Sequence, residues 1–291
     1  MDTLLSPKQV AQALRVSESS VKRWCDKGSI ATTYTDGGHR RIRMGDLAEF
    51  VRANKLVVQD FVPMGLAQSS PTVVSVEEAA PLMLEALLKG DEDRCSQLVM
   101  EMYLAKVPIH RICDQVIAQA FYKIGDKWAC GEADIYQERL GCKVAQRLLH
   151  RLQMLLPDPP QGALIALGCA TEGDQYCLGS TMAELVLRDA GWRAFSLGEN
   201  IPMESLASAI EHHKPKIVWL SCSFIVNEAN FIDRLNTLCD RFHSVGTLFA
   251  VGGQALNDDL VKKLRIDLYG RTMQEIFEFA QRVSQQNTQG N

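Results

Sequence analysis

Two groups of residues in this sequence have side chains and spacing that suit chemistry. The first lies between residues 17 and 43, where hydroxyls and cations follow one another closely. On one helix face such side chains can reach base edges and phosphates in a DNA major groove, and cations on a neighbouring hairpin can reach the adjacent backbone or minor groove. The residues predicted to contact DNA are Ser19, Ser20, Lys22 and Arg23 on the helix, and His39, Arg40, Arg41 and Arg43 on the hairpin.

The second group lies where short apolar stretches, predicted to be parallel strands, come to an end. Ligands of such sheets bind outside the carboxyl ends of the strands. Residues 172–179 form the first of these loops and end in a glycine that opens a helix, whose N-terminal amides can accept a polar ligand. A Gly-Gly pair follows the fourth strand, where a missing side chain lets a ligand lie close to the backbone. The residues predicted to line this pocket are Asp174, Tyr176, Gly179, Ser221, Ser223, Gly252 and Gly253.

The first group needs two short helices and a hairpin to position it. Ser6 and Ser17 can each cap a helix, and Gly28 ends the second one. Two short helices joined by a tight turn are typical of a helix-turn-helix, and a β-hairpin after them forms a wing. The predicted elements of this head, residues 1–58, are helices over 4–14, 17–27 and 46–52 and strands over 30–34 and 40–43.

The charge of the head differs from that of the rest of the chain. Residues 1–55 carry ten Lys or Arg and six Asp or Glu, a balance of +4, so the remaining residues carry −8 to give the net −4. A basic head on an acidic body is typical of a DNA-binding module attached to a separate effector region.

The 291 residues are too many for one ordinary core, and the patterns beyond the head predict two further domains. Residues 59–75 contain Pro, Gly and Ser without periodicity and predict a linker. Helical periodicity over 76–157 predicts a four-helix bundle, and alternating strands and helices over 158–287 predict a doubly wound, flavodoxin-like, five-stranded parallel sheet. The chain is therefore predicted to be a multidomain α and α/β protein. The helices expected in the bundle span 76–89, 91–106, 108–130 and 134–156, and the strands expected in the sheet span 162–167, 193–197, 217–221, 247–251 and 267–270.

Several classes of protein are disfavoured. No apolar run approaches the roughly 18 residues that cross a bilayer, and the nine cysteines include no CxxC pair, which favours a cytoplasmic protein with free thiols and no membrane partner. We find no nucleophile with a base, no paired carboxylates at useful spacing and no metal-ligand cluster. The sequence therefore predicts a protein that is not an enzyme, with no catalytic residues and no metal site.

The head resembles the MerR family of winged helix-turn-helix regulators. The resemblance covers residues 4–52, and Gly-Gly-His-Arg-Arg-Ile at 37–42 is its most specific part. It implies that the protein associates with itself, as a dimer or tetramer, and binds an inverted-repeat operator.

The α/β region resembles the cobalamin-binding domain family. That family carries Asp-x-His-x-x-Gly after strand one, Ser-x-Leu or Ser-x-Ser after strand three and Gly-Gly after strand four; the nucleotide tail of the cofactor threads into the domain and the motif His ligates cobalt. The bundle resembles the cap over the upper corrin face, and the order of domains is similar to the CarH and LitR family of light-responsive repressors. In that family adenosylcobalamin holds a DNA-binding tetramer together in the dark, and light dissociates it.

Two positions, Tyr176 and Arg139, depart from the family. Tyr176 stands where the cobalt-ligating His is expected, although Asp174 and Gly179 are kept. The cap signature is Trp, nine residues, then Glu-His, whereas here Trp128 is followed by Glu138 and Arg139. A neutral phenol is a poor cobalt ligand compared with imidazole. These departures suggest that the function has changed. The residues predicted to line the pocket from the bundle are Trp128, Glu138 and Arg139.

The sequence leaves the ligand open. One alternative is cobalamin without a His ligand, as in an adenosylcobalamin photoreceptor repressor that works without the motif His. A second is another tetrapyrrole or a smaller metabolite, and a third is an empty pocket that serves oligomerisation or docks an antagonist protein. A corrinoid carrier module of an enzyme is the alternative from another class, although carriers depend on the axial His and have no need of a DNA-binding head. Repression is expected from the resemblance.

Overall fold

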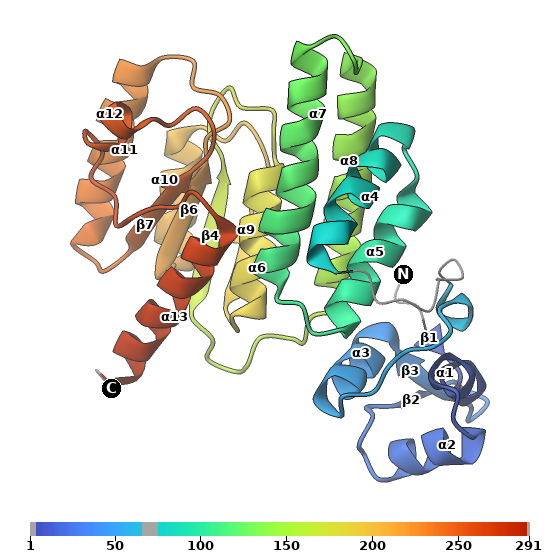
Figure 1. The fold of residues 1–291 in the computed structure, drawn as a ribbon. Coiled ribbons are helices and arrows are strands. Elements are labelled where there is room, and N and C mark those ends of the chain that lie inside the picture. Colours follow the sequence, from blue (N-terminus) through green and yellow to red (C-terminus); the bar gives the residue numbers. More distant parts are fainter. Residues whose placement is uncertain (1–3, 66–74, 290–291) are drawn as a thin grey trace. The chain divides into compact units, whose positions relative to one another are not determined.

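The computed structural model describes residues 4–65 and 75–289. The chain divides into two compact units, with the boundary between Asp158 and Pro159. Figure 1 shows the small helices and strands of the head and the longer helices α4 to α8 in the first unit, and the sheet with its helices in the second. Among the described residues, no helix is both long and apolar enough to pass through a membrane.

The head is a helix-turn-helix with a three-stranded antiparallel sheet. Ser6 caps the first helix in a reciprocal capping box with Gln9, and the hydroxyl of Ser17 accepts the Ser20 amide to cap the second. Arg15, with a left-handed φ of 50°, makes the turn between them. Its elements are β1 (Leu4–Leu5), α1 (Pro7–Leu14), α2 (Glu18–Asp26), β2 (Thr33–Tyr34), β3 (Arg40–Arg43) and α3 (Met44–Ala53), with strand order β1-β3-β2.

The start of the first predicted helix is wrong. Residues 4–5 form β1, which pairs antiparallel with the return strand of the wing. Leu5 lies opposite Ile42, and both side chains are buried. Burial of this apolar pair favours a strand, because a longer helix would carry Leu5 away from Ile42.

The predicted linker begins with ordered structure. Residues 62–64 form a 3-10 helix, η1 (Val62–Met64), and Phe61 and Met64 are buried. The amides of Gln59 and Asp60 donate to the carbonyl of Ala13 at the end of α1. This part of residues 59–75 therefore packs on the head, whereas 66–74 lie outside the described residues.

The next region is helical, as predicted. Ser75 caps its first helix in a capping box with Glu78, and Gly90 ends that helix in the left-handed conformation. The third predicted helix is continuous but contains wider π-helical turns, which apolar periodicity alone does not reveal. The elements are α4 (Val76–Lys89), α5 (Glu92–Leu104), α6 (Ile109–Ile112), the π-helix η2 (Cys113–Ala118), α7 (Gln119–Ala129) and α8 (Ile135–Gln153).

The second unit is the predicted doubly wound domain, with a parallel sheet in the order β5-β4-β6-β7-β8. Its first strand runs to Ala170, three residues beyond the expected end. The strands are β4 (Ile165–Ala170), β5 (Arg193–Ser196), β6 (Ile217–Ser221), β7 (Leu248–Gly252) and β8 (Leu268–Tyr269). The helices are α9 (Leu178–Asp189), α10 (Met203–His213), α11 (Glu228–His243), α12 (Asp258–Val261) and α13 (Met273–Gln289).

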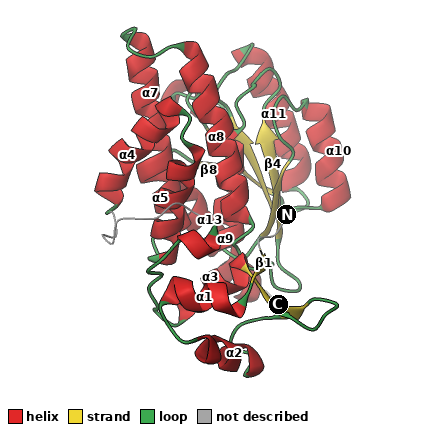
Figure 2. Cartoon of the chain, turned by 90° about the vertical axis from the view of Figure 1, so that its right-hand side faces the viewer, coloured by secondary structure: helices red, strands yellow, loops and turns green. Residues whose placement is uncertain are grey.

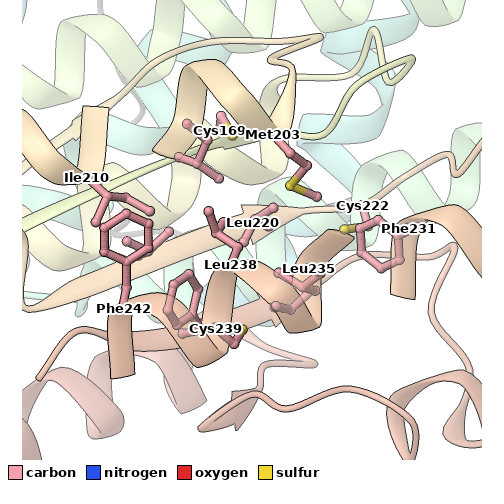
Figure 3. Packing of buried hydrophobic residues seen from close by; sticks show 14 of the residues in the cluster. Cys169, Met203, Ile210, Leu220, Cys222, Phe231, Leu235, Leu238, Cys239 and Phe242 are labelled. Carbon is pink, nitrogen blue, oxygen red and sulfur yellow. The ribbon is translucent and has the colours of Figure 1, made fainter. Parts of the chain in front are cut away.

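Helices cover both faces of this sheet (Figure 2), and each face has its own core. Ile210, Leu235 and Phe242 from α10 and α11 pack on one face with strand residues such as Leu220 (Figure 3). On the other face, α9 and α13 pack around Trp192 and Trp219. Continuous burial of the central strands explains why they read as unbroken apolar runs.

The loops at the carboxyl edge of the sheet are held by one buried carboxylate. Asp174, which is 0 % exposed, accepts hydrogen bonds from the amides of Ser223 and Phe224 after β6, at 2.5 and 3.2 Å, and from the amide of Tyr176 at 2.9 Å. Its own carbonyl accepts the amide of Asn200 from the loop after β5. One side chain thus joins the ends of β4 and β6, and its backbone adds the end of β5.

We expect Asp174→Ala to destabilise the second unit by about 3 kcal/mol or more, because three backbone amides lose the buried carboxylate that accepts their hydrogen bonds. Urea unfolding followed by tryptophan fluorescence measures this change. The control is Glu172→Ala in the same loop, whose exposed ion pair with Arg234 should contribute less than about 1 kcal/mol. Equal losses from the two substitutions would contradict the role given to Asp174.

All nine cysteines are free, and six of them are buried. Burial raises the pKa of the Cys169 thiol to about 12 and that of Cys222 further. A thiol reacts as the thiolate, so these side chains are protected at neutral pH. Cys130 is exposed.

We therefore expect a maleimide to modify Cys130 first in the native chain and to leave Cys169 and Cys222 unmodified, because a raised pKa and burial act in the same direction. Peptide mass spectrometry after timed labelling identifies the sites, and labelling in urea should reach all nine cysteines. Modification of native Cys169 as fast as Cys130 would show that this core opens readily.

Candidate functional site

The second helix of the head presents the predicted DNA-contacting residues. Val21 and Cys25 are buried against the rest of the head, which leaves Ser19, Lys22 and Arg23 exposed on the opposite side of α2. Ser20 is partly buried, and its hydroxyl lies 2.8 Å from that of the capping residue Ser17. Ser19 lies in the first turn of this short helix, Lys22 lies at its middle and Arg23 lies in its last turn.

The wing is joined to this helix by an ion pair. Arg40 on β3 places its guanidinium 2.6 Å from a carboxylate oxygen of Asp26 at the end of α2. The turn of the wing closes through the Thr35 amide, which donates to the carbonyl of His39, and Gly38 takes a φ of 74° that favours glycine. Arg40 therefore orients the wing against α2, a role that its charge alone did not predict.

The predicted cations differ in how they are neutralised within the head. Lys22 pairs with Glu18, and Arg43 pairs with Asp46, at 2.8 and 3.1 Å. Within residues 4–65 and 75–289, Arg23 and Arg41 form no ion pair. The guanidinium of Arg41 instead donates to the Arg40 carbonyl. Arg23 and Arg41 are consequently the side chains whose charge is most available to DNA.

The residues predicted to line the pocket lie partly in the first unit and partly in the second. In the bundle, Trp128 lies near the end of α7 and Glu138 and Arg139 lie in the first turns of α8, so all three belong to the end where these helices connect. Trp128 is 53 % exposed, and Tyr136 in the first turn of α8 is 65 % exposed. This end of the bundle therefore presents aromatic surface.

In the second unit, the carboxyl ends of β4 and β6 lie side by side and the chain winds in opposite directions from them, which makes this the topological switch point. The structure brings Asp174, Tyr176 and Ser223 together here through the buried carboxylate. Gly179 lies against Ser221, because a Cβ at Gly179 would be 2.5 Å from the Ser221 hydroxyl oxygen.

The glycines at the end of β7 lie close to neighbouring parts of this chain. A Cβ at Gly252 would lie 2.3 Å from the carbonyl oxygen of Gly270, and a Cβ at Gly253 would lie 2.3 Å from that of Cys222. Each missing side chain thus makes room for a neighbouring stretch of this chain. A side chain at either position would collide with backbone carbonyls of this chain.

Sequence reasoning missed three residues below this edge. Trp219, in the middle of β6, is 2 % exposed and lies across Gly168 of β4, where a Cβ would be only 2.2 Å from its ring. Its indole N–H donates to the hydroxyl of Ser180 in the first turn of α9, at 3.0 Å. The sequence did contain a signal for this contact. Gly168 lies in the middle of one apolar strand and Trp219 lies in the middle of another, and a glycine inside a strand often marks a close approach of neighbouring groups.

The residues present do not fit a cobalamin held in the manner of the family. Tyr176 cannot ligate cobalt as an imidazole does, and the close contacts of Gly168, Gly179 and Gly253 are made with protein atoms. Within the described parts of the chain, His, Cys, Asp and Glu form no group of three able to hold a metal ion.

Comparison with protein families and curated proteins identifies both regions. Residues 4–55 match the family described as a helix-turn-helix domain, and residues 82–153, which lie in the bundle, match the family described as a B12 binding domain. The HTH-type transcriptional repressor CarH of Myxococcus xanthus is 32 % identical over 158 residues, which are 54 % of this chain and 51 % of CarH. The chain thus aligns with about half the length of that relative.

Other similar proteins are corrinoid proteins. The trimethylamine corrinoid protein of Methanosarcina barkeri is 20 % identical over 206 residues, covering 67 % of this chain and 92 % of that one. The solved structure of the Methanosarcina barkeri monomethylamine corrinoid protein superposes with a TM-score of 0.59 at 19 % identity, covering 69 % of this chain and 96 % of that one. At this identity the likeness concerns the fold. The chain therefore combines a region that matches a helix-turn-helix domain, a region that matches a B12 binding domain, and an α/β fold like that of the corrinoid protein, and over half its length it is similar to a CarH repressor.

Proposed function

We propose that this chain is a MerR-type transcriptional repressor whose head binds an inverted-repeat operator and whose body brings heads together without a His-ligated cobalamin. The observation that carries the proposal is the head itself, in which exposed Lys22 and Arg23 on α2 and the Arg41 wing strand share one small fold. Such a regulator works where the DNA is, in the cytoplasm.

The electrostatics of the head support DNA as its partner. Residues 1–55 are net positive although the chain as a whole is acidic, and the residues with the least neutralised cations, Arg23 and Arg41, lie on the two elements predicted to touch DNA. Phosphate neutralisation by Lys and Arg supplies much of the affinity of such modules. The eight predicted contact residues remain the surface that we assign to DNA.

Avidity is the proposed link between body and operator. A single short helix in one groove gives modest affinity, whereas joining two heads raises it by about 10²–10⁴ through effective concentration. Any partner that separates the bodies, such as an antagonist protein, would then release the operator. We assign the self-association of this chain to residues 76–287.

The rival function is that of a corrinoid carrier, to which the similar methanogen proteins give weight. The helix-turn-helix domain and the tyrosine at position 176 argue against it, because a carrier needs an axial ligand and has no use for DNA. We therefore propose a regulatory protein without a catalytic role.

Selection from a random duplex library by the full-length protein tests DNA binding directly. We expect it to recover two inverted half-sites whose centres are separated by roughly 10–10.5 base pairs or a multiple of that spacing. Scrambling one half-site should weaken binding at least about a hundredfold, measured by fluorescence anisotropy. If the library shows no enrichment, or one half-site suffices, the proposal of paired heads is wrong.

Arg41→Ala should weaken binding to all sequences alike and reduce the slope of log affinity against log salt by about 1, because one phosphate contact is lost. Arg23→Ala should instead relax sequence preference, with a cost of about 1–3 kcal/mol on the selected site, if its side chain contacts a base edge. Arg193→Ala, an exposed cation of the second unit, is the matched control and should change neither quantity. Unchanged salt slopes in all three variants would remove the wing from the DNA-binding surface.

A further inference from the structure

We propose that Trp219 fills the space between β4, β6 and α9 that the inserted tail of a cobalamin would need, so that the second unit is a closed domain that works without this cofactor. The inference deepens the proposed function, on which it rests for the role of the body. It names the residue that closes the site.

The first step in the argument is the position of the indole. In the parallel register of the sheet, Trp219 on β6 lies opposite Gly168 on β4, and Gly168 lies opposite Ser196 on β5. The ring of Trp219 passes so close to Gly168 that any side chain at Gly168 would collide with it. The tryptophan therefore lies across β4, beneath the carboxyl edge where the predicted pocket opens.

The second step is that the polar atom of this indole is satisfied by protein. Its N–H donates to Ser180, which is 0 % exposed, and the Ser180 hydroxyl lies 2.8 Å from that of Ser196. Ser196 in turn accepts the amide of Gly198 and donates its own amide to Glu184 of α9. A buried indole with a complete set of partners is a permanent part of the core, because leaving its N–H unpaired would cost free energy.

The third step is that the entrance is also closed. Gly179 at the start of α9 is in contact with the hydroxyl of Ser221 at the end of β6, and the buried Asp174 binds the next loop across the same edge. The tail of cobalamin ends in a dimethylbenzimidazole, a fused ring system close to indole in size. A close-packed interior has no room for both rings.

The experiment compares five full-length proteins: wild type, Trp219→Ala, Tyr176→His, the double variant that combines them, and Trp192→Ala. Trp192 is the matched control, because it is a tryptophan of the same core cluster, 1 % exposed, whose removal leaves a cavity of similar size elsewhere. Each protein is incubated with adenosylcobalamin or cyanocobalamin in the dark and passed through gel filtration, and the retained corrin is measured by absorbance. Thermal unfolding with and without free 5,6-dimethylbenzimidazole follows.

We expect the wild type, Tyr176→His and Trp192→Ala to retain no corrin and the double variant to retain it near stoichiometrically. Dimethylbenzimidazole should raise the melting temperature of Trp219→Ala and of the double variant, but not that of the other three proteins, because an apolar cavity of the right shape takes up such a ring. Stoichiometric corrin on the wild type or on Tyr176→His overturns the inference. So does a folded Trp219→Ala that ignores dimethylbenzimidazole.

If Trp219→Ala does not fold, Trp219→Leu leaves a smaller cavity and serves in the same assays, and corrin on the wild type still decides the matter against the inference. DNA binding by each protein is measured in parallel. If the wild type does not bind DNA sequence-selectively, the proposed function is wrong. If the wild type retains corrin, only the inference that Trp219 closes the cobalamin site is wrong.

Discussion

The carboxyl edge of the sheet depends on the buried carboxylate of Asp174. Loops at strand ends have no ladder partners of their own, so their amides need another acceptor when they are removed from water. Asp174 supplies it for the loops after β4 and β6, and its carbonyl serves the loop after β5. Asp174, which the sequence predicts to line a ligand pocket, therefore forms hydrogen bonds within the chain itself.

Beneath this edge, glycines of the second unit are in close contact with other parts of the same chain. Glycine removes a side chain and so permits close approach, but it does not say what approaches. In this fold Gly168 admits the indole of Trp219, Gly179 admits the hydroxyl of Ser221, and Gly253 admits the backbone of Cys222. A scaffold related to cobalamin-binding domains can thus keep its glycines and have its interior filled by its own side chains. For this chain, a fold similar to that of cobalamin-binding domains does not by itself imply the same ligand.

The head separates cations that hold the structure from cations that are available to a partner. Arg40 ties the wing to α2 through Asp26, whereas Arg23 and Arg41 face no carboxylate within the described parts of the chain. Exposed ion pairs contribute little to stability, so the value of the Arg40 pair lies in the orientation it gives to the wing. In the proposed function, operator affinity depends on the number of heads that the body joins, so association of the body is the point of control.

The sequence by itself determined most of the order of elements. Caps at Ser6 and Ser17, the Gly-Gly turn of the wing, helical periodicity in the bundle and the apolar strands of the sheet are all local signals, and local hydrogen bonding and side-chain alternation decide them. Only the tertiary structure decided that Leu4 and Leu5 form a strand, because their pairing partner is β3, far along the chain. The same holds for the pocket. Whether a glycine faces a ligand or Trp219, and whether Asp174 faces solvent or three amides, depends on which strands become neighbours. That arrangement is set by packing of the whole domain, so no motif read along one strand could reveal it.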